Sequence, residues 1–209
     1  MKAVIFDLDG VLCSTDEYHY RAWKALADRL CIPFDRETND RLRGVSRMAS
    51  LEIVLERAGR KFTEEEKRAL AEEKNETYRA FLVQMSPADL SDEARETLEK
   101  LRRRGYKLAI GSSSKNAKTI LRQIGLEGYF DAVSDGTNIT RSKPDPEVFL
   151  KAAEYLGVSP SDCLVVEDAV AGAQAGHAGG FTVACVGDAA RSRAGDYNLT
   201  DFKQLLTIL

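Results

Sequence analysis

Residues Ala3-Val4-Ile5-Phe6-Asp7-Leu8-Asp9-Gly10 decide the fold. The first four form a short, continuous apolar run, which is typical of a strand buried on both faces of a parallel sheet. Similar runs recur further along the chain, and a shorter candidate strand follows the first of these recurrences. The runs lie at residues 108–110, 163–166 and 181–185, and the shorter candidate at residues 131–134.

Segments of helical length separate these runs, so that strand and helix alternate along the chain. The expected helices cover residues 92–104, 116–124, 146–156 and 169–178. This alternation is characteristic of doubly wound α/β folds, in which helices cover both faces of a parallel sheet. The sequence therefore predicts an α/β protein with a Rossmann-like, parallel-sheet core.

Residues 16–81 interrupt the alternation, because they show helical periodicity alone. The segment leaves the core just after the first strand and returns near residue 87. Both connections pass the carboxyl edge of the sheet, where α/β proteins bind their ligands. We therefore expect a core domain of residues 1–14 and 87–209, with an inserted all-helical cap domain of residues 15–86 that acts as a lid.

The composition excludes several classes of partner. The chain has 209 residues and a net charge of -3, so it lacks the basic excess that nucleic acid or an anionic membrane would select. Four cysteines without a C-x-x-C pair favour a reducing compartment over a disulfide framework or a structural zinc site. No leader or membrane-spanning run is recognisable. We expect a cytoplasmic, unprocessed monomer.

Two acidic pairs end strands of the predicted sheet. Asp7 and Asp9 are two residues apart on extended backbone, so their side chains are expected to face one ligand, and Glu167 with Asp168 ends a second strand. Carboxylate oxygens are suited to a hard cation such as Mg²⁺. Taken singly, each pair is also explained by a turn or by a helix cap, with Asp168 capping a helix that begins near Ala169. Capping does not explain why both pairs meet at one edge.

Two further segments point to an anion. The residues Gly111-Ser112-Ser113-Ser114-Lys115-Asn116 follow a strand and precede a helix, where hydroxyls and free N–H groups would meet a phosphate. Serines that serve as ordinary turn and cap residues explain this segment equally well. In Ser142-Lys143-Pro144-Asp145-Pro146, we expect Asp145 as N-cap and Pro146 as first helical residue. Lys143 has no such structural role, and its proline-restricted loop would hold an ammonium group near the acids, although an unexceptional surface lysine is the ordinary alternative.

Together these motifs resemble those of the haloacid dehalogenase superfamily of phosphotransferases. The match rests on Asp7-x-Asp9-Gly10, Ser112, Lys143 and Glu167-Asp168 in this order and spacing, and it covers nearly the whole chain. Within that superfamily the helical insert is similar to that of the β-phosphoglucomutase family. The insert carries the likeness in residues 15–19, 21–26, 44–47, 74–75 and 86–89. Two departures are Ala169, where relatives often carry Ser, and residues 90–92, where many have a Pro-Gly turn.

The resemblance implies a catalytic role for four core residues and a metal site. Asp7 would be the nucleophile that carries an aspartyl phosphate, and Asp9 the general acid and base. Ser112 and Lys143 would hold the transferring phosphoryl group, assisted by Ser114 and Asn116. The Mg²⁺ ligands would be Asp7, Asp9 through its backbone carbonyl, Glu167 and Asp168.

For the cap, the resemblance implies a set of substrate-binding residues. Arg47 would bind the phosphate that is not being transferred, because a guanidinium matches phosphate oxygens in a bidentate way. His19 would pair with Asp9 or its neighbours, although a surface histidine is the ordinary alternative. Trp23 could equally be part of the hydrophobic core of the cap, and Lys74 could equally be a solvated surface charge. The implied set is Thr15, His19, Trp23, Gly44, Arg47, Ser50 and Lys74.

The implied activity is that of a β-phosphoglucomutase. Such an enzyme interconverts β-D-glucose 1-phosphate and glucose 6-phosphate through glucose 1,6-bisphosphate. The alternative is a haloacid dehalogenase-type sugar-phosphate phosphatase, which shares the core motifs but lets water attack the aspartyl phosphate. A sugar-phosphate sensor without catalysis is disfavoured, because binding alone does not need Asp9 beside Asp7.

Overall fold

The computed structural model describes residues 1–42 and 45–209. The chain divides into two compact units. The core unit comprises residues 1–14 and 86–209, and the cap unit comprises Thr15–Met85.

The core unit is built on a parallel sheet, as the apolar runs predict. Its described residues form six strands in the order β3-β2-β1-β4-β5-β6, and every neighbouring pair is parallel. Their bounds are β1 Ala3–Phe6, β2 Lys107–Gly111, β3 Ala132–Ser134, β4 Cys163–Glu167, β5 Thr182–Cys185 and β6 Tyr197–Asn198. Apart from the two-residue β6, whose residues are exposed and carry no apolar pattern, the sequence predicts each of them.

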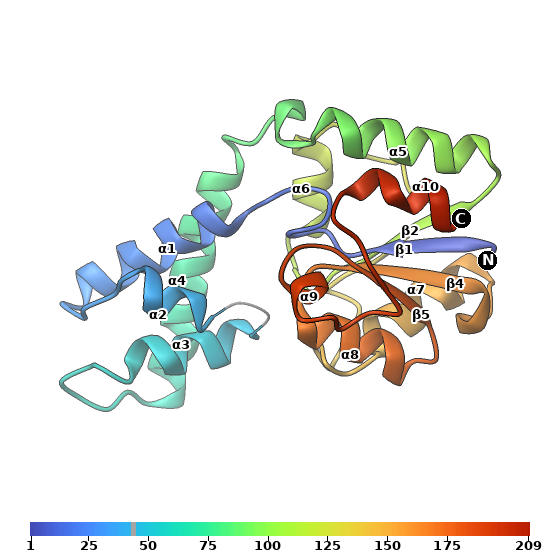
Figure 1. Ribbon diagram of the computed structural model, residues 1–209. Coiled ribbons are helices and arrows are strands. Elements are labelled where there is room, and N and C mark those ends of the chain that lie inside the picture. The colour runs from blue at the N-terminus through green and yellow to red at the C-terminus, as the bar shows by residue number, and fades with distance from the viewer. Residues whose placement is uncertain (43–44) are drawn as a thin grey trace. The chain divides into compact units, whose positions relative to one another are not determined.

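Helices cover both faces of this sheet. Helices α5 and α10 lie on one face, and α7 and α8 lie on the other (Figure 1). The helices of the core unit are α5 Asp92–Arg103, α6 Ala117–Gln123, α7 Glu147–Leu156, α8 Val170–Ala178, α9 Gly187–Arg191 and α10 Leu205–Ile208, with the short 3-10 helices η1 Pro87–Asp89, η2 Pro160–Asp162 and η3 Phe202–Gln204.

Alternate residues of each strand supply the two hydrophobic layers. Ile5 of β1 and Val165 of β4 point into the layer beneath α7 and α8, where they pack with Phe149. Phe6 occupies the opposite layer, and its ring lies 5.9 Å from that of Phe202 in η3. Because successive side chains of a strand alternate between faces, a run buried throughout requires a covering layer on each side.

The strand register brings the carboxyl ends of β1, β2 and β4 to one edge. Phe6 is aligned with Ile110 on one side and with Val166 on the other. Beyond the strand, the Asp7 N–H still donates to the Val166 carbonyl at 2.9 Å. The residues that follow these three strands therefore share the edge at which the sequence predicts the ligand site.

The cap unit is helical throughout its described residues. Its helices are α1 Asp16–Arg29, α2 Arg36–Asp40, α3 Arg47–Leu55 and α4 Glu64–Leu82. Helix α4 begins with a capping box in which the Thr63 hydroxyl accepts from the Glu66 N–H and the Glu66 carboxylate accepts from the Thr63 N–H. Helix α4 packs against α1 and α3, and Leu26, Leu51 and Leu70 of the three helices belong to the hydrophobic core of the unit.

The start of α7 differs from the prediction by one residue. The helix begins at Glu147, and Pro146 occupies the N-cap position that the sequence assigns to Asp145. Asp145 still accepts a hydrogen bond from the Glu147 N–H at 3.0 Å. The prediction is wrong because a proline fits the residue before a helix as well as its first position, and backbone geometry decides between them.

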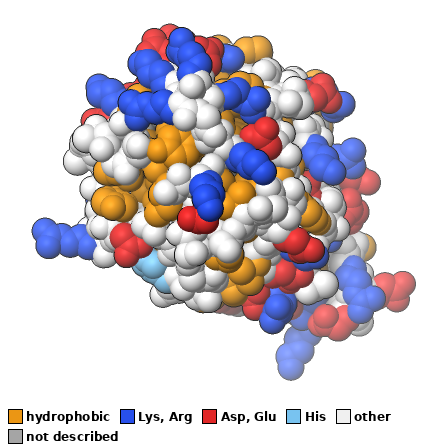
Figure 2. Space-filling view, turned by 90° about the vertical axis from the view of Figure 1, so that its right-hand side faces the viewer, with side chains coloured by type: hydrophobic (Ala, Val, Ile, Leu, Met, Phe, Trp, Pro, Cys, Tyr) orange, Lys and Arg blue, Asp and Glu red, His pale blue; other side chains and the backbone are white. Residues whose placement is uncertain are grey.

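Acidic and basic residues occur in similar numbers in the sequence, and they are mixed on the surface (Figure 2). On the face shown in Figure 2, acidic and basic side chains are interspersed among apolar ones. In the described part of the chain, no helix is both long enough and apolar enough to cross a membrane.

Gly111 is expected to be intolerant of a side chain. A Cβ at this position would lie 2.6 Å from the Phe149 ring and 3.1 Å from a methyl group of Ile5, and both of these side chains are fully buried. We expect Gly111→Ala to lower the free energy of unfolding by about 1–3 kcal/mol, measured by urea denaturation. At Gly59 a Cβ meets nothing within 4 Å. Gly59→Ala should therefore change stability by less than about 0.5 kcal/mol, and equal effects of the two substitutions would contradict the packing argument.

Candidate active site

Three carboxylates meet at the carboxyl edge of the sheet. Asp7 follows β1, Glu167 ends β4, and Asp168 comes next in the chain. Each offers one oxygen such that the three oxygens lie within 4.8 Å of one another. Asp7 and Glu167 are 7% and 1% exposed, so two of these charges are withdrawn from bulk water.

Lys143 lies against this acid cluster, where the sequence predicts an ammonium group. Its Nζ is 2.5 Å from Asp7 Oδ1 and 2.5 Å from Glu167 Oε1. The ammonium also sits 4.7 Å from the ring centre of Phe149. Lys143 comes from the loop before α7, so one side chain joins this loop to the ends of β1 and β4.

The cluster perturbs the pKa values of its members. Burial raises the pKa of the Asp7 carboxyl, and Glu167 and Asp168 raise it further against the opposing effect of Lys143. For Lys143, burial favours the neutral amine, but Asp7 and Glu167 outweigh it and raise the pKa of the ammonium above its usual value. Lys143 therefore remains charged at neutral pH.

Two glycines lie in close contact with carboxylates of the acid cluster. Gly10 has a φ of +83°, and a Cβ there would overlap the Asp168 carboxylate. A Cβ at Gly172 in α8 would overlap the Glu167 carboxylate in the same way. Only glycine leaves room for both carboxylates to reach the edge.

The alternative in which Asp168 caps α8 is wrong. The helix begins at Val170, and its N-cap Ala169 makes no side-chain cap hydrogen bond. Instead Glu167 Oε2 accepts from the N–H groups of Asp168 and Ala169, at 2.9 Å each. The other oxygen of Glu167 faces Lys143, and the Asp168 carboxylate belongs to the acid cluster.

The serine loop after β2 contains the turns expected of serine. Ser112 Oγ accepts from the Ser114 N–H at 3.2 Å, and Ser114 Oγ accepts from the Asn116 N–H at 3.1 Å. Ser112 is 2% exposed, and its N–H donates to the Ser134 carbonyl at the same sheet edge. The loop therefore lies at the carboxyl edge of the sheet, and the role of its hydroxyls towards phosphate stays a prediction.

The cluster fits a divalent cation. Three carboxylates face a single ammonium, which leaves an excess of negative charge, and every ligand atom is a hard oxygen. Asp9 follows two residues after Asp7 and is partly buried. Its side chain does not belong to this group of three, and its predicted contribution to the metal is the backbone carbonyl.

A second polar cluster lies within the cap unit. Lys74 of α4 is 3% exposed, and its Nζ lies 2.8 Å from His19 Nδ1 of α1. The same ammonium sits 4.7 Å from the Trp23 ring centre and 4.8 Å from that of Tyr78, and the His19 ring stacks on Tyr78 at 4.0 Å. Lys74 is thus no solvated charge, and His19 is no ordinary surface histidine.

Arg47, at the start of α3, extends this cationic region. Its guanidinium lies 3.4 Å from Glu72 Oε2, and Glu72 Oε1 accepts from the Asn75 amide at 3.1 Å. Burial, together with Lys74 and Arg47, lowers the pKa of His19 well below 6.5. A neutral His19 can accept a hydrogen bond from the Lys74 ammonium.

The other predicted cap residues have varied positions. Thr15 is buried at the N-cap of α1, and Ser50 is buried in α3. Trp23 belongs to the hydrophobic core of the cap unit, as its structural alternative predicts, and also faces Lys74. Gly44 lies outside the described residues.

Comparisons with known proteins identify the family. Residues 1–180 match the model of the haloacid dehalogenase-like hydrolases. The chain belongs to this family. A β-phosphoglucomutase of Bacillus subtilis is 44% identical over 90% of this chain and 84% of its own length. A crystal structure of β-phosphoglucomutase from Clostridium difficile has a TM-score of 0.90 at 35% identity and covers 98% of this chain and 93% of its own.

Phosphatases of the haloacid dehalogenase-like family are also similar to this chain. A phosphorylated carbohydrates phosphatase of Thermotoga maritima is 33% identical over 87% of this chain and 82% of its own length. Similarity to this chain therefore extends to relatives named as mutases and to relatives named as phosphatases.

Sequence reasoning missed several residues that support the two clusters of this haloacid dehalogenase-like protein. Phe149 and Glu147 belong to the first turn of α7, next to the Lys143 loop. Tyr78 stands four residues after Lys74 on α4, a spacing that places both on one helix face and could have indicated the contact. Glu72 carried no signal, because α4 contains many acidic residues.

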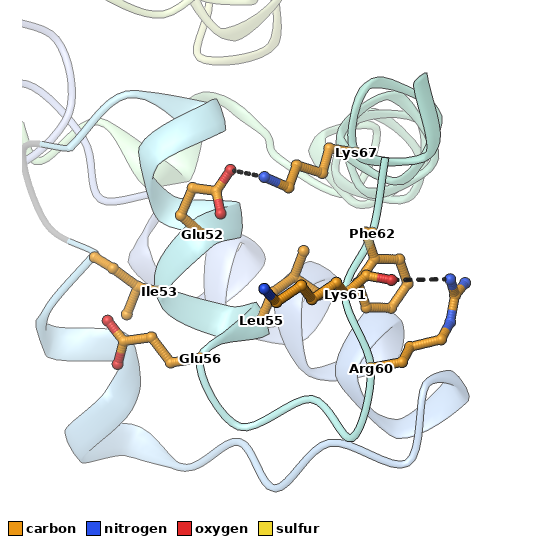
Figure 3. A pocket seen from close by; sticks show the side chains of 8 residues that line it. All are labelled: Glu52, Ile53, Leu55, Glu56, Arg60, Lys61, Phe62 and Lys67. Atoms are coloured by element: carbon orange, nitrogen blue, oxygen red, sulfur yellow. Dashed lines mark hydrogen bonds and ion pairs between the residues drawn. The ribbon is translucent and has the colours of Figure 1, made fainter. Parts of the chain in front are cut away.

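A groove elsewhere on the cap unit has its own charged lining (Figure 3). Lys67 lies 2.7 Å from Glu52, and Arg60 lies 2.9 Å from Glu66. Glu56 is paired with Arg41 at 2.8 Å. These charges compensate one another, and the groove contains none of the residues that the family resemblance implies.

Stability of this haloacid dehalogenase-like protein should fall at mildly acidic pH because of His19. In the unfolded chain its pKa is near 6.5, whereas the folded value is well below. Between these two values the unfolded chain binds a proton that the folded chain does not. The free energy of unfolding should therefore fall as pH drops below about 6.5, by up to about 1.4 kcal/mol per pH unit. We expect His19→Gln to reduce this loss, measured by urea denaturation at pH 7.5 and 5.5. An identical pH dependence in both proteins would contradict the prediction.

Proposed function

We propose that this protein is a β-phosphoglucomutase that interconverts β-D-glucose 1-phosphate and glucose 6-phosphate. The reaction would proceed through an aspartyl phosphate on Asp7 and a glucose 1,6-bisphosphate intermediate. In this proposal residues 1–14 and 87–209 form the catalytic domain and residues 15–86 the cap domain. The protein would be a cytoplasmic monomer with no nucleic-acid or membrane partner.

The observation that supports a mutase over a phosphatase is the second cluster in the cap unit. The acid cluster with Lys143 is sufficient for one phosphoryl group, which is all that a phosphatase handles. A sugar bisphosphate carries a second phosphoryl group, which also has to be bound. Arg47 and Lys74, together with His19, supply cationic and polar groups for it from helices α1, α3 and α4. The 44% identity to the Bacillus subtilis enzyme supports the same choice.

The proposed chemistry starts from phosphorylated Asp7. The C6 hydroxyl of β-glucose 1-phosphate attacks the phosphorus, so that the O6–P bond forms and the bond from phosphorus to Asp7 breaks. Asp9 takes the hydroxyl proton. The bisphosphate then reorients, and Asp7 attacks the phosphorus on O1. The O1–P bond breaks, Asp9 returns the proton to O1, and glucose 6-phosphate leaves with Asp7 phosphorylated again.

Lys143 would stabilise charge during both transfers. The contact of its ammonium with Asp7 Oδ1 supports this role, since a carboxylate oxygen of Asp7 would attack and leave. Ser112, Ser114 and Asn116 would orient the oxygens of the same phosphoryl group. We propose Mg²⁺ as the cation held by Asp7, Glu167, Asp168 and the Asp9 carbonyl, where it would neutralise phosphoryl charge.

In the cap, the proposed roles concern the substrate. Arg47 would bind the phosphate that is not reacting, and the groups around Lys74 would contact the sugar. Glu72 holds the Arg47 guanidinium before substrate arrives. Thr15, Trp23, Gly44 and Ser50 complete the proposed substrate-binding set.

Phosphorus-31 NMR distinguishes the two candidate functions. With β-glucose 1-phosphate, Mg²⁺ and a trace of glucose 1,6-bisphosphate, we expect the glucose 6-phosphate signal to grow. Asp7→Asn should lower this rate by several orders of magnitude, since the covalent route is lost. EDTA should stop it and added Mg²⁺ restore it. Accumulation of inorganic phosphate without glucose 6-phosphate would instead establish a phosphatase.

Arg47→Ala should impair the mutase reaction selectively. A charge-assisted contact to phosphate is worth about 1.5–3 kcal/mol, so isomerisation should fall about ten- to a hundredfold. Hydrolysis of acetyl phosphate, which has no second phosphate, should change less than about twofold. Arg57→Ala is the matched control, because Arg57 follows the same helix and is half exposed. Equal losses of both reactions in Arg47→Ala would exclude a role for Arg47 at the distal phosphate.

A further inference from the structure

The Glu147 carboxylate accepts several hydrogen bonds from the loop that carries Lys143. Glu147 is the first residue of α7, and its side chain is only 13% exposed. Its Oε2 accepts from the Thr140 N–H at 3.0 Å, from the Thr140 hydroxyl at 2.9 Å and from the Arg141 N–H at 2.7 Å. One oxygen of Glu147 thus ties the helix to the loop two and three residues before Lys143.

The electrostatics agree with an ionised Glu147. The hydrogen bond from the Arg141 N–H lowers the pKa of the carboxyl, and the donors on Thr140 add to the effect. The Arg141 guanidinium lies 3.6 Å from Oε2. Hydrogen bonds to a charged acceptor are stronger than those between neutral groups, so this attachment is firm.

The preceding half of the loop has a separate attachment. Asp135 follows β3, is fully buried, and accepts from the Thr137 N–H at 2.8 Å. Asn138 Oδ1 accepts from the Asp135 N–H at 3.2 Å. The path up to residue 138 is therefore set without Glu147, whereas the backbone N–H groups of residues 140 and 141 donate to Glu147. The Arg141 guanidinium is shared with Asp145, at 3.1 Å.

Helix α7 also supports the ammonium group itself. Phe149, two residues after Glu147, presents its ring 4.7 Å from Lys143 Nζ. The Phe149 ring is fully buried against Gly111 and Ile5, so it is a rigid support. The start of α7 thus fixes both the backbone before Lys143 and one side of its ammonium group.

We propose that Glu147 is a positioning residue that sets the Lys143 ammonium against Asp7 and Glu167. The proposal rests on the function proposed above only in that Lys143 takes part in phosphoryl transfer at Asp7. In the contacts of the described residues, Glu147 itself touches none of the three carboxylates of the acid cluster. It acts through the loop, as groups behind a catalytic site commonly do.

Loss of this attachment has two distinct consequences. With Lys143 displaced, transfer to Asp7 loses its cation and slows. Asp7 and Glu167 at the same time lose a positive charge 2.5 Å away, so their affinity for a divalent cation rises. A merely destabilised protein would not bind Mg²⁺ more tightly.

The test compares Glu147→Ala, Glu147→Gln and Lys143→Ala in the full chain. We expect Glu147→Ala to slow acetyl phosphate hydrolysis about ten- to a hundredfold and to tighten Mg²⁺ binding, measured by calorimetry, about threefold or more. Lys143→Ala should show both effects at least as strongly. Glu147→Gln retains an oxygen acceptor for the loop and should recover most of the activity. Glu154→Ala, on the exposed side of α7, is the matched control and should resemble the parent protein.

A double-mutant cycle decides whether Glu147 acts through Lys143. In the Lys143→Ala background, adding Glu147→Ala should change Mg²⁺ affinity less than about twofold. Additive effects, weaker Mg²⁺ binding by Glu147→Ala, or an unchanged hydrolysis rate would each overturn the proposal. If Glu147→Ala does not fold, the same cycle is run with Glu147→Gln. The smaller increase in Mg²⁺ affinity expected for Glu147→Gln must likewise disappear in the Lys143→Ala background. Since Mg²⁺ binding needs no sugar, the cycle remains decisive if glucose 1-phosphate proves not to be the substrate.

Discussion

The ion pairs of Lys143 with Asp7 and Glu167 are the interaction on which the core of this protein depends. They join the ends of β1 and β4 to the loop before α7, and all three groups are almost inaccessible to water. Removing one partner would leave a buried charge uncompensated, which is a costly change. The remaining excess of carboxylate creates a place for a divalent cation, so structure and chemistry rest on the same charge balance.

The surrounding backbone is arranged to make this charge balance possible. Glu167 accepts from the N–H groups of Asp168 and Ala169 just before α8, and glycines at positions 10 and 172 leave space for the carboxylates. Glu147 and Phe149 support Lys143 from α7. Residues outside the acid cluster therefore help to determine where its charged groups lie.

The cap unit contains a buried ammonium group of its own, that of Lys74. It buries the Lys74 ammonium between aromatic rings and beside a neutral histidine, which compensates part of the lost hydration through cation–π contacts and a hydrogen bond. In the function proposed above, this positive charge would contact the anionic substrate.

The sequence by itself determined the architecture and the core motifs. Buried strands of a parallel sheet must be apolar throughout, so residues 3–6 and 163–166 are recognisable, and acids directly after them must share one edge. The tertiary structure decided the rest. Only folding shows that Glu167 rather than Asp168 binds the start of α8, that Lys74 is buried against Tyr78, and that Glu147 holds the Lys143 loop. These contacts join residues whose individual patterns are those of ordinary caps and solvated charges, and long-range packing alone distinguishes them.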